Sequence, residues 1–384
     1  MRAGWTVEAL GNLCDVLDSQ RKPITKKDRQ PGEYPYYGAT GIQDYVDGFL
    51  FDEPLVLVGE DGAKWDVGES TAFSVEGKCW VNNHAHVLRP HRKILIDNWL
   101  IHYFFHTDLT QFVSGLTVPK LTQGSLREIP IPLPPVAEQR RIVSILDEAF
   151  DGIATAKANA EKNLQNARAL FESHLDATFG QSGNGWLSST LEEVVDASCT
   201  LSYGIVQPGD ECSDGLPIVR PTDLTTKLIK LDGLKRIKAE LAAGYKRTAL
   251  RGGELLLCVR GSTGVISIAA AELLGANVTR GIVPIRFDEA RVLQNFGYHL
   301  MTAGLVQGQI REKTYGTALM QINIGDLRKV DVSFPSINEQ ARIAAALDVM
   351  AEETRRLESI YQRKLAALDE LKQSLLHQAF SGAL

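Results

Sequence analysis

The chain has 384 residues, of which 44% are hydrophobic and 23% charged, and its formal net charge is −6. Such a composition is typical of globular protein, and the length predicts two or three domains. No stretch approaches the roughly 18 apolar residues that span a membrane, and the N-terminal segment has no apolar core with a basic flank, so we expect no secretory signal. The five cysteines are scattered and form no CxxC pair, which argues against a zinc knuckle or a disulfide framework and favours a reducing cytoplasm.

The charge is unevenly distributed. Basic residues cluster in residues 21–29 and again in residues 235–251, whereas the predicted helices carry much of the acid. A charge run is usually a solvated face, so these clusters permit binding to a polyanion without demonstrating it.

Glycine and proline separate short strand-like runs in the first part of the chain, for example at residues 54–58. Similar runs recur at residues 216–220 and 254–260, with short helical pieces between them. We therefore expect two globular α+β domains, at residues 1–134 and 182–334.

A loop rich in hydrogen-bonding side chains closes each domain, at residues 114–123 and 315–323. Gln and Asn can pair bidentately with adenine, and Lys or Arg with guanine. Two Gly-rich turns, at residues 59–64 and 260–264, lack the spacing of a P-loop but carry basic residues that can reach a phosphate or a base edge. One such loop alone is most often an ordinary surface loop. The candidate DNA contacts are Lys64, Ser114, Thr117, Lys120, Thr122, Gln123, Arg220, Arg260, Ser262, Thr263, Tyr315, Thr317, Gln321 and Asn323.

Two long proline-free segments follow Pro135 and Pro335. Proline is tolerated in the first turn of a helix and not in its interior, and apolar residues then recur at steps of mostly three and four. We expect helical segments at residues 135–181 and 335–384, each with a helix of about 40 residues that is roughly 60 Å long at 1.5 Å per residue, paired antiparallel as a coiled coil. Packing of each helix on its own globule, or dimerisation between chains, remains an alternative. The expected packing residues are Ile142, Leu146, Ala149, Ile153, Leu164, Ile343, Leu347, Met350, Leu357 and Leu365.

The two halves of the chain repeat each other. An offset of 201 residues relates Glu138 to Glu339, and the match runs without a gap from about residue 115 to residue 180. Trp5 and Trp186 mark similar starts of the two units, whose globular contents differ. The order globule, helix, globule, helix predicts a pseudo-twofold internal repeat in which one architecture holds two diverged modules.

Signatures of catalysis are missing from the sequence. There is no GxSxG, no Asn-Pro-Pro-aromatic tetrapeptide of amino-group DNA methyltransferases, and no Gly-rich loop suited to S-adenosylmethionine or ATP. The histidines at 84, 86, 102 and 106 have no further ligands at characteristic spacing, so we expect structural or surface roles for them and no metal. The chain therefore reads as a module that recognises something for enzymes carried by other chains.

The duplicated P-x-x-EQ-x-x-I…LD entry into a long helix, after a variable globule that starts near a Trp, resembles the specificity subunit of Type I restriction–modification systems. The phrases YPYYGATGIQDYV, GKCWVNNHAHVLRP and LLCVRGSTG add to this resemblance, which covers nearly the whole chain. The globules are the variable part of that family, so base-contacting residues carry over poorly.

The resemblance implies a non-catalytic, cytoplasmic prokaryotic protein that binds double-stranded DNA. Each globule would read one half of a split site, and the helices would fix the gap. Two modification (methyltransferase) subunits and two restriction (translocase and nuclease) subunits would be its partners, with S-adenosylmethionine, ATP and magnesium bound by those partners and no cofactor by this chain. The alternatives are a self-contained adenine methyltransferase, which the missing tetrapeptide disfavours, and a coiled-coil scaffold whose globules bind protein.

Overall fold

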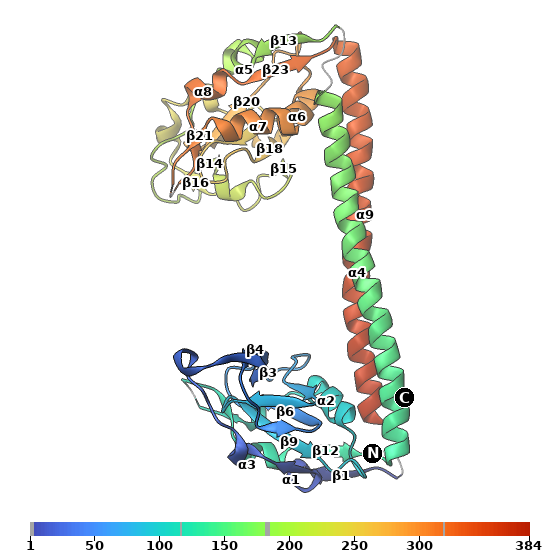
Figure 1. The fold of residues 1–384 in the computed structure, drawn as a ribbon. Helices are drawn as coiled ribbons and strands as arrows, with labels where there is room; N and C mark the ends of the chain where they lie inside the picture. Colours follow the sequence, from blue (N-terminus) through green and yellow to red (C-terminus); the bar gives the residue numbers. More distant parts are fainter. Residues whose placement is uncertain (1–3, 116, 181–184, 318) are drawn as a thin grey trace. The chain divides into compact units, whose positions relative to one another are not determined.

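The computed structural model describes residues 4–115, 117–180, 185–317 and 319–384 (Figure 1). The chain divides into two compact units: unit 1 comprises residues 1–162 with 361–384, and unit 2 comprises residues 163–360. The expected domain boundary between residues 181 and 182 lies outside the described residues. Two helices of 45 residues each, α4 (Val136–Gly180) and α9 (Ile337–Ser381), contribute to both units.

Unit 1 is built around an antiparallel four-stranded sheet with the order β2-β9-β6-β7. Helix α2 (Asp97–His106) contacts strands β6 and β7 of this sheet. A second sheet has the order β4-β3-β8-β5, and β1 pairs with β12. The strands are β1 (Thr6–Ala9), β2 (Cys14–Val16), β3 (Pro31–Gly38), β4 (Gly41–Val46), β5 (Phe51–Asp52), β6 (Leu55–Gly59), β7 (Ala72–Val75), β8 (Lys78–Val81), β9 (Ala85–Pro90) and β12 (Pro130–Leu133), with short helices α1 (Leu10–Leu13) and α3 (Gln123–Glu128).

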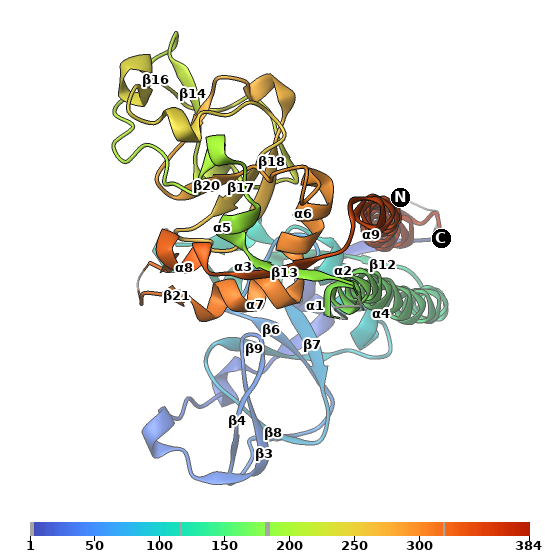
Figure 2. The ribbon, with the colours of Figure 1, turned by 90° about the horizontal axis from the view of Figure 1, so that it is seen from above.

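Unit 2 contains a sheet with the order β15-β18-β17-β20 and a smaller one with the order β16-β14-β19. Helices α6 (Gln294–Thr302) and α7 (Gly304–Glu312) contact each other beside the larger sheet (Figures 1 and 2). The remaining elements are β13 (Leu187–Thr190), α5 (Leu191–Val194), β14 (Leu216–Val219), β15 (Leu228–Ile229), β16 (Arg236–Ile237), β17 (Leu255–Cys258), β18 (Ile266–Ala269), β19 (Asn277–Val278), β20 (Ile282–Ile285), α8 (Ile324–Arg328) and β23 (Asp331–Phe334).

The central strand of each unit serves two hydrophobic cores. In β6, Val56 and Val58 face the core that contains Trp99, whereas the alternate residues Leu55 and Leu57 face a second cluster. Successive side chains of a strand point to opposite faces of a sheet, so a strand buried on both sides is apolar throughout. Strand β17 of unit 2 divides its buried residues between two clusters in the same way. This explains why both strands read as uninterrupted apolar runs.

A buried glutamine fastens the start of each long helix to its globule. The amide nitrogen of Gln139 donates to the carbonyls of Ile94 (2.7 Å) and Pro134 (2.9 Å), and its amide oxygen accepts from the N–H of Ile96 (3.0 Å). These bonds satisfy backbone groups that would be costly to bury unpaired. In unit 2, Gln340 makes the same three bonds with Arg291, Pro335 and Leu293.

Within each unit, segments of the two long helices pack in opposite directions. In unit 1, Leu376 and Ala379 of α9 share the core of Ile142 and Leu146, and Lys157 pairs with Asp369 at 2.7 Å. In unit 2, Leu175 and Phe179 of α4 share a core with Ala344 and Leu347 of α9, and Arg168 pairs with Glu358 at 2.6 Å.

The residues expected to line the helix seam differ in burial. Ile142, Leu146, Ile153 and Leu347 are buried, but Leu357 is 41% exposed, which corrects our expectation that it packs in the seam. Its neighbour Glu358 pairs with Arg168, so this stretch of unit 2 presents ion-pairing side chains to the other helix. Ala149, Leu164, Ile343, Met350 and Leu365 are half-buried.

Candidate nucleic-acid interface

Each unit carries a short hairpin beside a loop from its central strand. In unit 1 the hairpin consists of β10 (Val113–Ser114) and β11 (Lys120–Leu121), and Asp61 forms a β-bridge with Lys120. In unit 2 it consists of β21 (Thr314–Tyr315) and β22 (Gln321–Ile322), and Arg260 forms a β-bridge with Gln321. The structure therefore brings each predicted loop against the predicted Gly-rich turn of the same unit.

Glycine is required at one position of each hairpin. Gly115 has φ +96° and Gly316 has φ +120°, a backbone region that other residues rarely adopt. A Cβ atom on Gly115 would lie 2.5 Å from the carbonyl oxygen of Val118, and one on Gly316 would lie 2.3 Å from that of Leu319. These two glycines stand at the 201-residue offset, which explains why the sequence repeat begins here.

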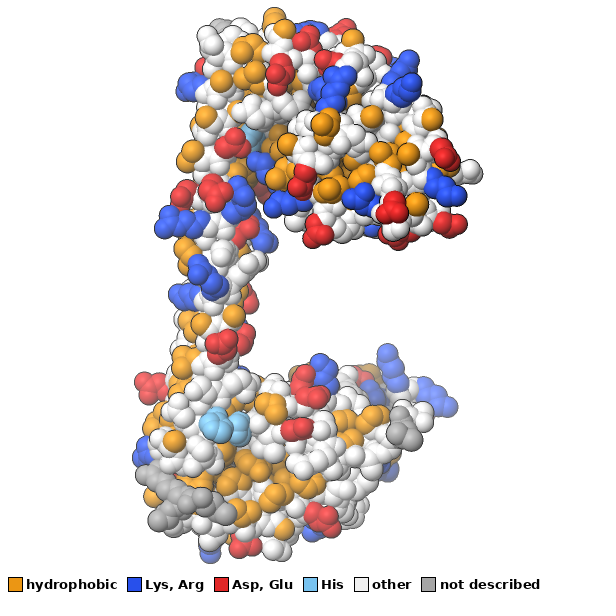
Figure 3. Space-filling view, turned by 180° about the vertical axis from the view of Figure 1, so that it is seen from behind, with side chains coloured by type: hydrophobic (Ala, Val, Ile, Leu, Met, Phe, Trp, Pro, Cys, Tyr) orange, Lys and Arg blue, Asp and Glu red, His pale blue; other side chains and the backbone are white. Residues whose placement is uncertain are grey.

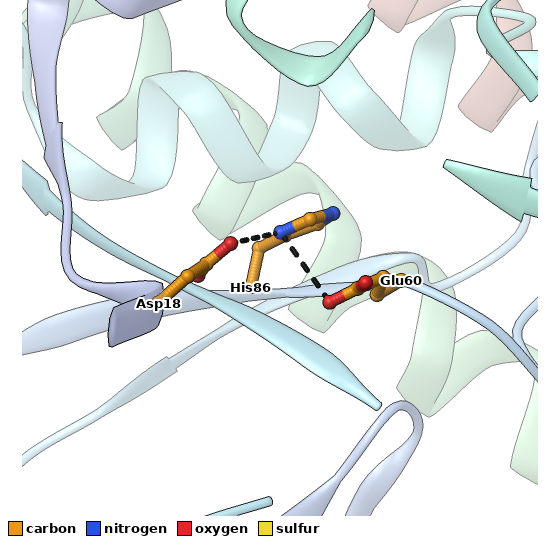
Figure 4. A group of neighbouring side chains, drawn as sticks. All are labelled: Asp18, Glu60 and His86. Atoms are coloured by element: carbon orange, nitrogen blue, oxygen red, sulfur yellow. Dashed lines mark hydrogen bonds and ion pairs between the residues drawn. The ribbon is translucent and has the colours of Figure 1, made fainter. Parts of the chain in front are cut away.

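A network of charged side chains, buried except at Lys120, supports the hairpin of unit 1. Lys120 Nζ lies 2.7 Å from Glu60 Oε1, and Glu60 also pairs with Arg21. Arg21 reaches Asp18 at 3.3 Å, and Asp18 Oδ2 lies 2.6 Å from His86 Nδ1 (Figure 4). The network joins the loop before β3 to strand β9 and to the hairpin.

Both ring nitrogens of His86 have an oxygen atom within hydrogen-bonding distance. Burial opposes ionisation of Asp18, but the hydrogen bond and charge of His86, the backbone N–H of Val87 and the charge of Arg21 together hold its pKa below the ordinary value. The ionised carboxylate can only accept, so His86 Nδ1 donates to it. His86 Nε2 lies 2.7 Å from the carbonyl oxygen of Leu121.

Asp18, Glu60 and His86 lie close enough together to suggest a metal site. A histidine ligand needs a nitrogen that is free to face the metal, however, and each ring nitrogen of His86 already lies within 2.7 Å of a protein oxygen. Glu60 is already neutralised by Arg21 and Lys120. We therefore interpret the group as an internal ion network and not as a metal centre.

Removal of one charge from this network should destabilise unit 1. We expect Asp18→Asn to lower its free energy of unfolding by about 3 kcal/mol, because the buried side chains of Arg21 and His86 then lose one of their two carboxylate neighbours. Hydrogen exchange of peptides from β6 and β9 measures the loss. The exposed Asp66→Asn is the matched control and should leave exchange unchanged.

The pH dependence has a defined sign. Because folding lowers the pKa of Asp18, its stabilisation is present above the unfolded carboxyl pKa of about 3.9 and is lost as the pH falls through the lowered value. Equal exchange in Asp18→Asn and in the unmodified chain at neutral pH would contradict the network.

Unit 2 has a cavity of about 140 Å³ where unit 1 has the ion network. Predicted residues Arg260, Tyr315, Gln321 and Asn323 line it, together with Tyr203 and Arg280. Sequence reasoning missed Tyr203 and Arg280, because they come from loops far from the hairpin in the chain and share no spacing with it.

The other predicted contacts occupy several environments. Lys64 pairs with Glu69 at 3.1 Å, and Arg220 pairs with Asp223 at 2.8 Å. Thr122 Oγ1 caps α3 by accepting from the N–H of Ser125 (3.2 Å). Ser114 Oγ and Thr263 Oγ1 donate to backbone carbonyls of the hairpin segments, whereas Thr117, Gln123, Ser262 and Thr317 are exposed.

Basic and acidic side chains are intermixed on the face that Figure 3 draws, which shows no wide patch of one sign. No helix in the described part of the chain is both long and apolar enough to cross a bilayer.

Comparison with known proteins decides the family. The model of the Type I restriction modification DNA specificity domain matches residues 2–165 and 184–364. The chain belongs to this family. Its two matched segments each contain one globule and the first part of the long helix that follows.

Named relatives agree with this membership. A Haemophilus influenzae protein assigned as type I restriction enzyme specificity subunit S.HindORF215P is 29% identical over 349 residues, which are 88% of this chain and 86% of that protein. The EcoBI specificity subunit of Escherichia coli is 25% identical over 75% of this chain and 66% of its own length.

Solved structures share the fold. One comes from work on complex assembly and conformational transition of the type I R-M system; it has a TM-score of 0.75 and 20% identity and covers 100% of this chain and 99% of its own. The HsdS subunit of Thermoanaerobacter tengcongensis has a TM-score of 0.61 and 19% identity and covers 100% and 98%.

Proposed function

We propose that this specificity-family chain recognises a split DNA sequence for a Type I restriction–modification complex, with each globule reading one half. The observation that carries this proposal is that the two units share one backbone arrangement but present different side chains on it. Both units place a hairpin against a turn of the central strand, but unit 1 presents Glu60, Asp61 and Lys120 there, and unit 2 presents Arg260 and Gln321. Base edges are distinguished by donor and acceptor patterns, so two different sets of side chains suit two different half-sites.

The polar residues around each hairpin suit two kinds of DNA contact, one to phosphates and one to base edges. Basic and hydroxyl side chains that contact phosphates orient a protein on the duplex, and contacts to base edges supply sequence information. Because the chain has a net charge of −6, we expect the phosphate contacts to come from its local basic clusters and from the partner subunits.

The long helices would fix the gap between half-sites as an antiparallel coiled coil within a pseudo-twofold repeat. Each has 45 residues, which corresponds to about 68 Å at 1.5 Å per residue. The exposed apolar side chains of Leu170 and Val349 on these helices would help to dock the modification subunits.

Catalysis would belong to the partners in this proposal. Two modification subunits would bind S-adenosylmethionine and methylate adenine, and two restriction subunits would use ATP and magnesium to translocate and cut DNA. This chain, in the prokaryotic cytoplasm, would supply recognition alone.

We expect the purified chain to transfer no methyl group to DNA, because its sequence has no Asn-Pro-Pro-aromatic tetrapeptide and no Gly-rich loop for the donor. Transfer of radiolabelled methyl groups is measured for the chain alone, for the modification subunit alone and for both together. Sequence-specific methylation should require both. Methyl transfer by the chain free of any partner would make it a self-contained methyltransferase and would overturn the proposal.

A further inference from the structure

The cavity of unit 2 is lined by hydrogen-bonding groups from five segments of the chain. Arg260 follows β17, Arg280 follows β19, Tyr315 and Gln321 lie on the hairpin, and Asn323 precedes α8. Tyr203, the remaining polar side chain of the lining, donates to the carbonyl of Ile322 (3.3 Å) and accepts from the N–H of Ile324 (3.3 Å). Both hydrogen bonds of the Tyr203 hydroxyl are thus made to backbone groups, and they fix the end of the hairpin against the cavity wall.

A chain of hydrogen bonds fixes the amide side chains. Gln321 Nε2 donates to Tyr315 Oη (3.1 Å), and Tyr315 Oη donates to Asn323 Oδ1 (2.6 Å). With the oxygen of Asn323 engaged, its amide nitrogen is available as a donor. Side chains held in one orientation before a ligand arrives lose less conformational entropy when they bind it.

In the part of the chain that the structure describes, the two arginines of this cavity are not ion-paired with a carboxylate, unlike several other arginines of unit 2. Arg220 pairs with Asp223 and Arg286 with Glu254, but neither Arg260 nor Arg280 has a side-chain hydrogen bond or ion pair among the described residues. No carboxylate lines the cavity. At the corresponding place in unit 1, Lys120 is neutralised by Glu60.

A cavity with two unpaired guanidinium groups and an amide donor selects an acceptor-only group. On the backbone and in the major groove, two parts of DNA have this chemistry: the phosphate oxygens and the guanine edge, where O6 and N7 both accept. Arg260 is half-buried and joined to the hairpin by the β-bridge to Gln321, whereas Arg280 is exposed at the rim. The inner position suits a base edge, and the outer position suits the backbone.

We propose that Arg260 reads the O6 and N7 atoms of one guanine in the half-site of unit 2, with Arg280 placed on a neighbouring phosphate. This inference rests on the proposed function and adds a specific base and residue to it. Its first consequence is that the half-site of unit 2 contains a guanine. A half-site without guanine on either strand would overturn the assignment.

The test uses the complex of this chain with its modification subunit, bound to duplexes that carry the sequence motif which this complex methylates. Each guanine of the half-site is replaced in turn by 7-deazaguanine, which lacks the N7 acceptor. We expect one replacement to weaken binding of the unmodified complex by about 10-fold or more, and to have no effect on the Arg260→Ala complex.

Two further variants separate base reading from charge. Arg260→Lys keeps the charge but replaces the rigid planar fork by a flexible point charge, so its response to 7-deazaguanine should be smaller than that of the unmodified complex. Arg280→Ala should weaken binding to all sequences alike and reduce its salt dependence, as expected of a phosphate contact. The exposed Arg311 of α7, which neither lines the cavity nor belongs to the basic clusters, is the control, and Arg311→Ala should leave the motif and affinity unchanged.

The outcomes distinguish this inference from the function on which it rests. Equal loss of affinity by Arg260→Ala for motif and unrelated DNA would make Arg260 a phosphate contact and overturn the guanine assignment, while the proposed function would stand. Failure of the unmodified complex to prefer any sequence would instead contradict the proposed function.

Discussion

Seven residues added to each long helix should widen the gap in the recognised DNA sequence by up to about three base pairs. The insertions belong after Lys162 in α4 and after Arg363 in α9, between the ion pairs Lys157–Asp369 and Arg168–Glu358, so that both pairs are kept. Seven residues are two turns at 3.5 residues per turn and preserve the phase of the seam. They add roughly 10 Å, and base pairs stack about 3.4 Å apart.

An insertion of two residues at the same places is the matched control. It rotates the following part of each helix by about 200°, at 100° per residue, and turns apolar side chains toward water. This variant should lose stability or assembly and should not read a new sequence. Methylation-aware sequencing reports the motif of the seven-residue variant, and an unchanged gap in a folded, active complex would mean that the helices do not set it.

The long helices were the features most accessible to sequence reasoning. Pro135 and Pro335 mark their starts, and the 201-residue repeat aligns Gln139 with Gln340, which make equivalent bonds to their globules. Periodicity did not predict the exposure of Leu357, because a repeat of apolar residues does not indicate where ion-pairing residues interrupt a seam. The fold class was predictable because the spacing of apolar residues and the positions of glycine and proline are local properties of the chain.

The candidate site was predictable only in part, because its contacts are long-range. Arg260 and Gln321 were both predicted as DNA contacts, but nothing in their spacing indicates that they form a β-bridge. The partners of His86 lie on separate elements, at Asp18 and Leu121, and no motif joins them. A histidine that seemed merely structural in the sequence therefore proves to link the hairpin of unit 1 to its core.

Exchange of the second globule should replace one half of the recognised sequence. Residues 186–334 form a natural cassette, because Leu187 of β13 pairs with Phe334 of β23, so that the segment begins and ends on neighbouring strands. Residues 6–133 form the matching cassette of unit 1, where Thr6 pairs with Leu133. Each cassette keeps the buried helix-start glutamine and its bond to the preceding proline, although the partners of that glutamine within the globule are exchanged.

The donor globule must fit the helix residues that remain. Leu175, Phe179, Ala344 and Leu347 belong to the core of unit 2, and Trp186 packs against Phe179. A relative with the same residues at these five positions provides a suitable cassette, because packing defects of even one methylene are felt in a close-packed core. Replacement of residues 186–334 by the chain's own segment, through the same cloning steps, controls for the procedure.

The central claim is that the two globules read half-sites independently, and the methylated motif of the cassette variant tests it most directly. Methylation-aware sequencing is applied to cells that express the modification subunit with the unmodified chain, with the 186–334 variant, or with the 6–133 variant. Our account predicts that each variant changes a different half of the motif and keeps the other half and the gap. A change of both halves by one cassette, or of neither half in an active complex, would contradict it.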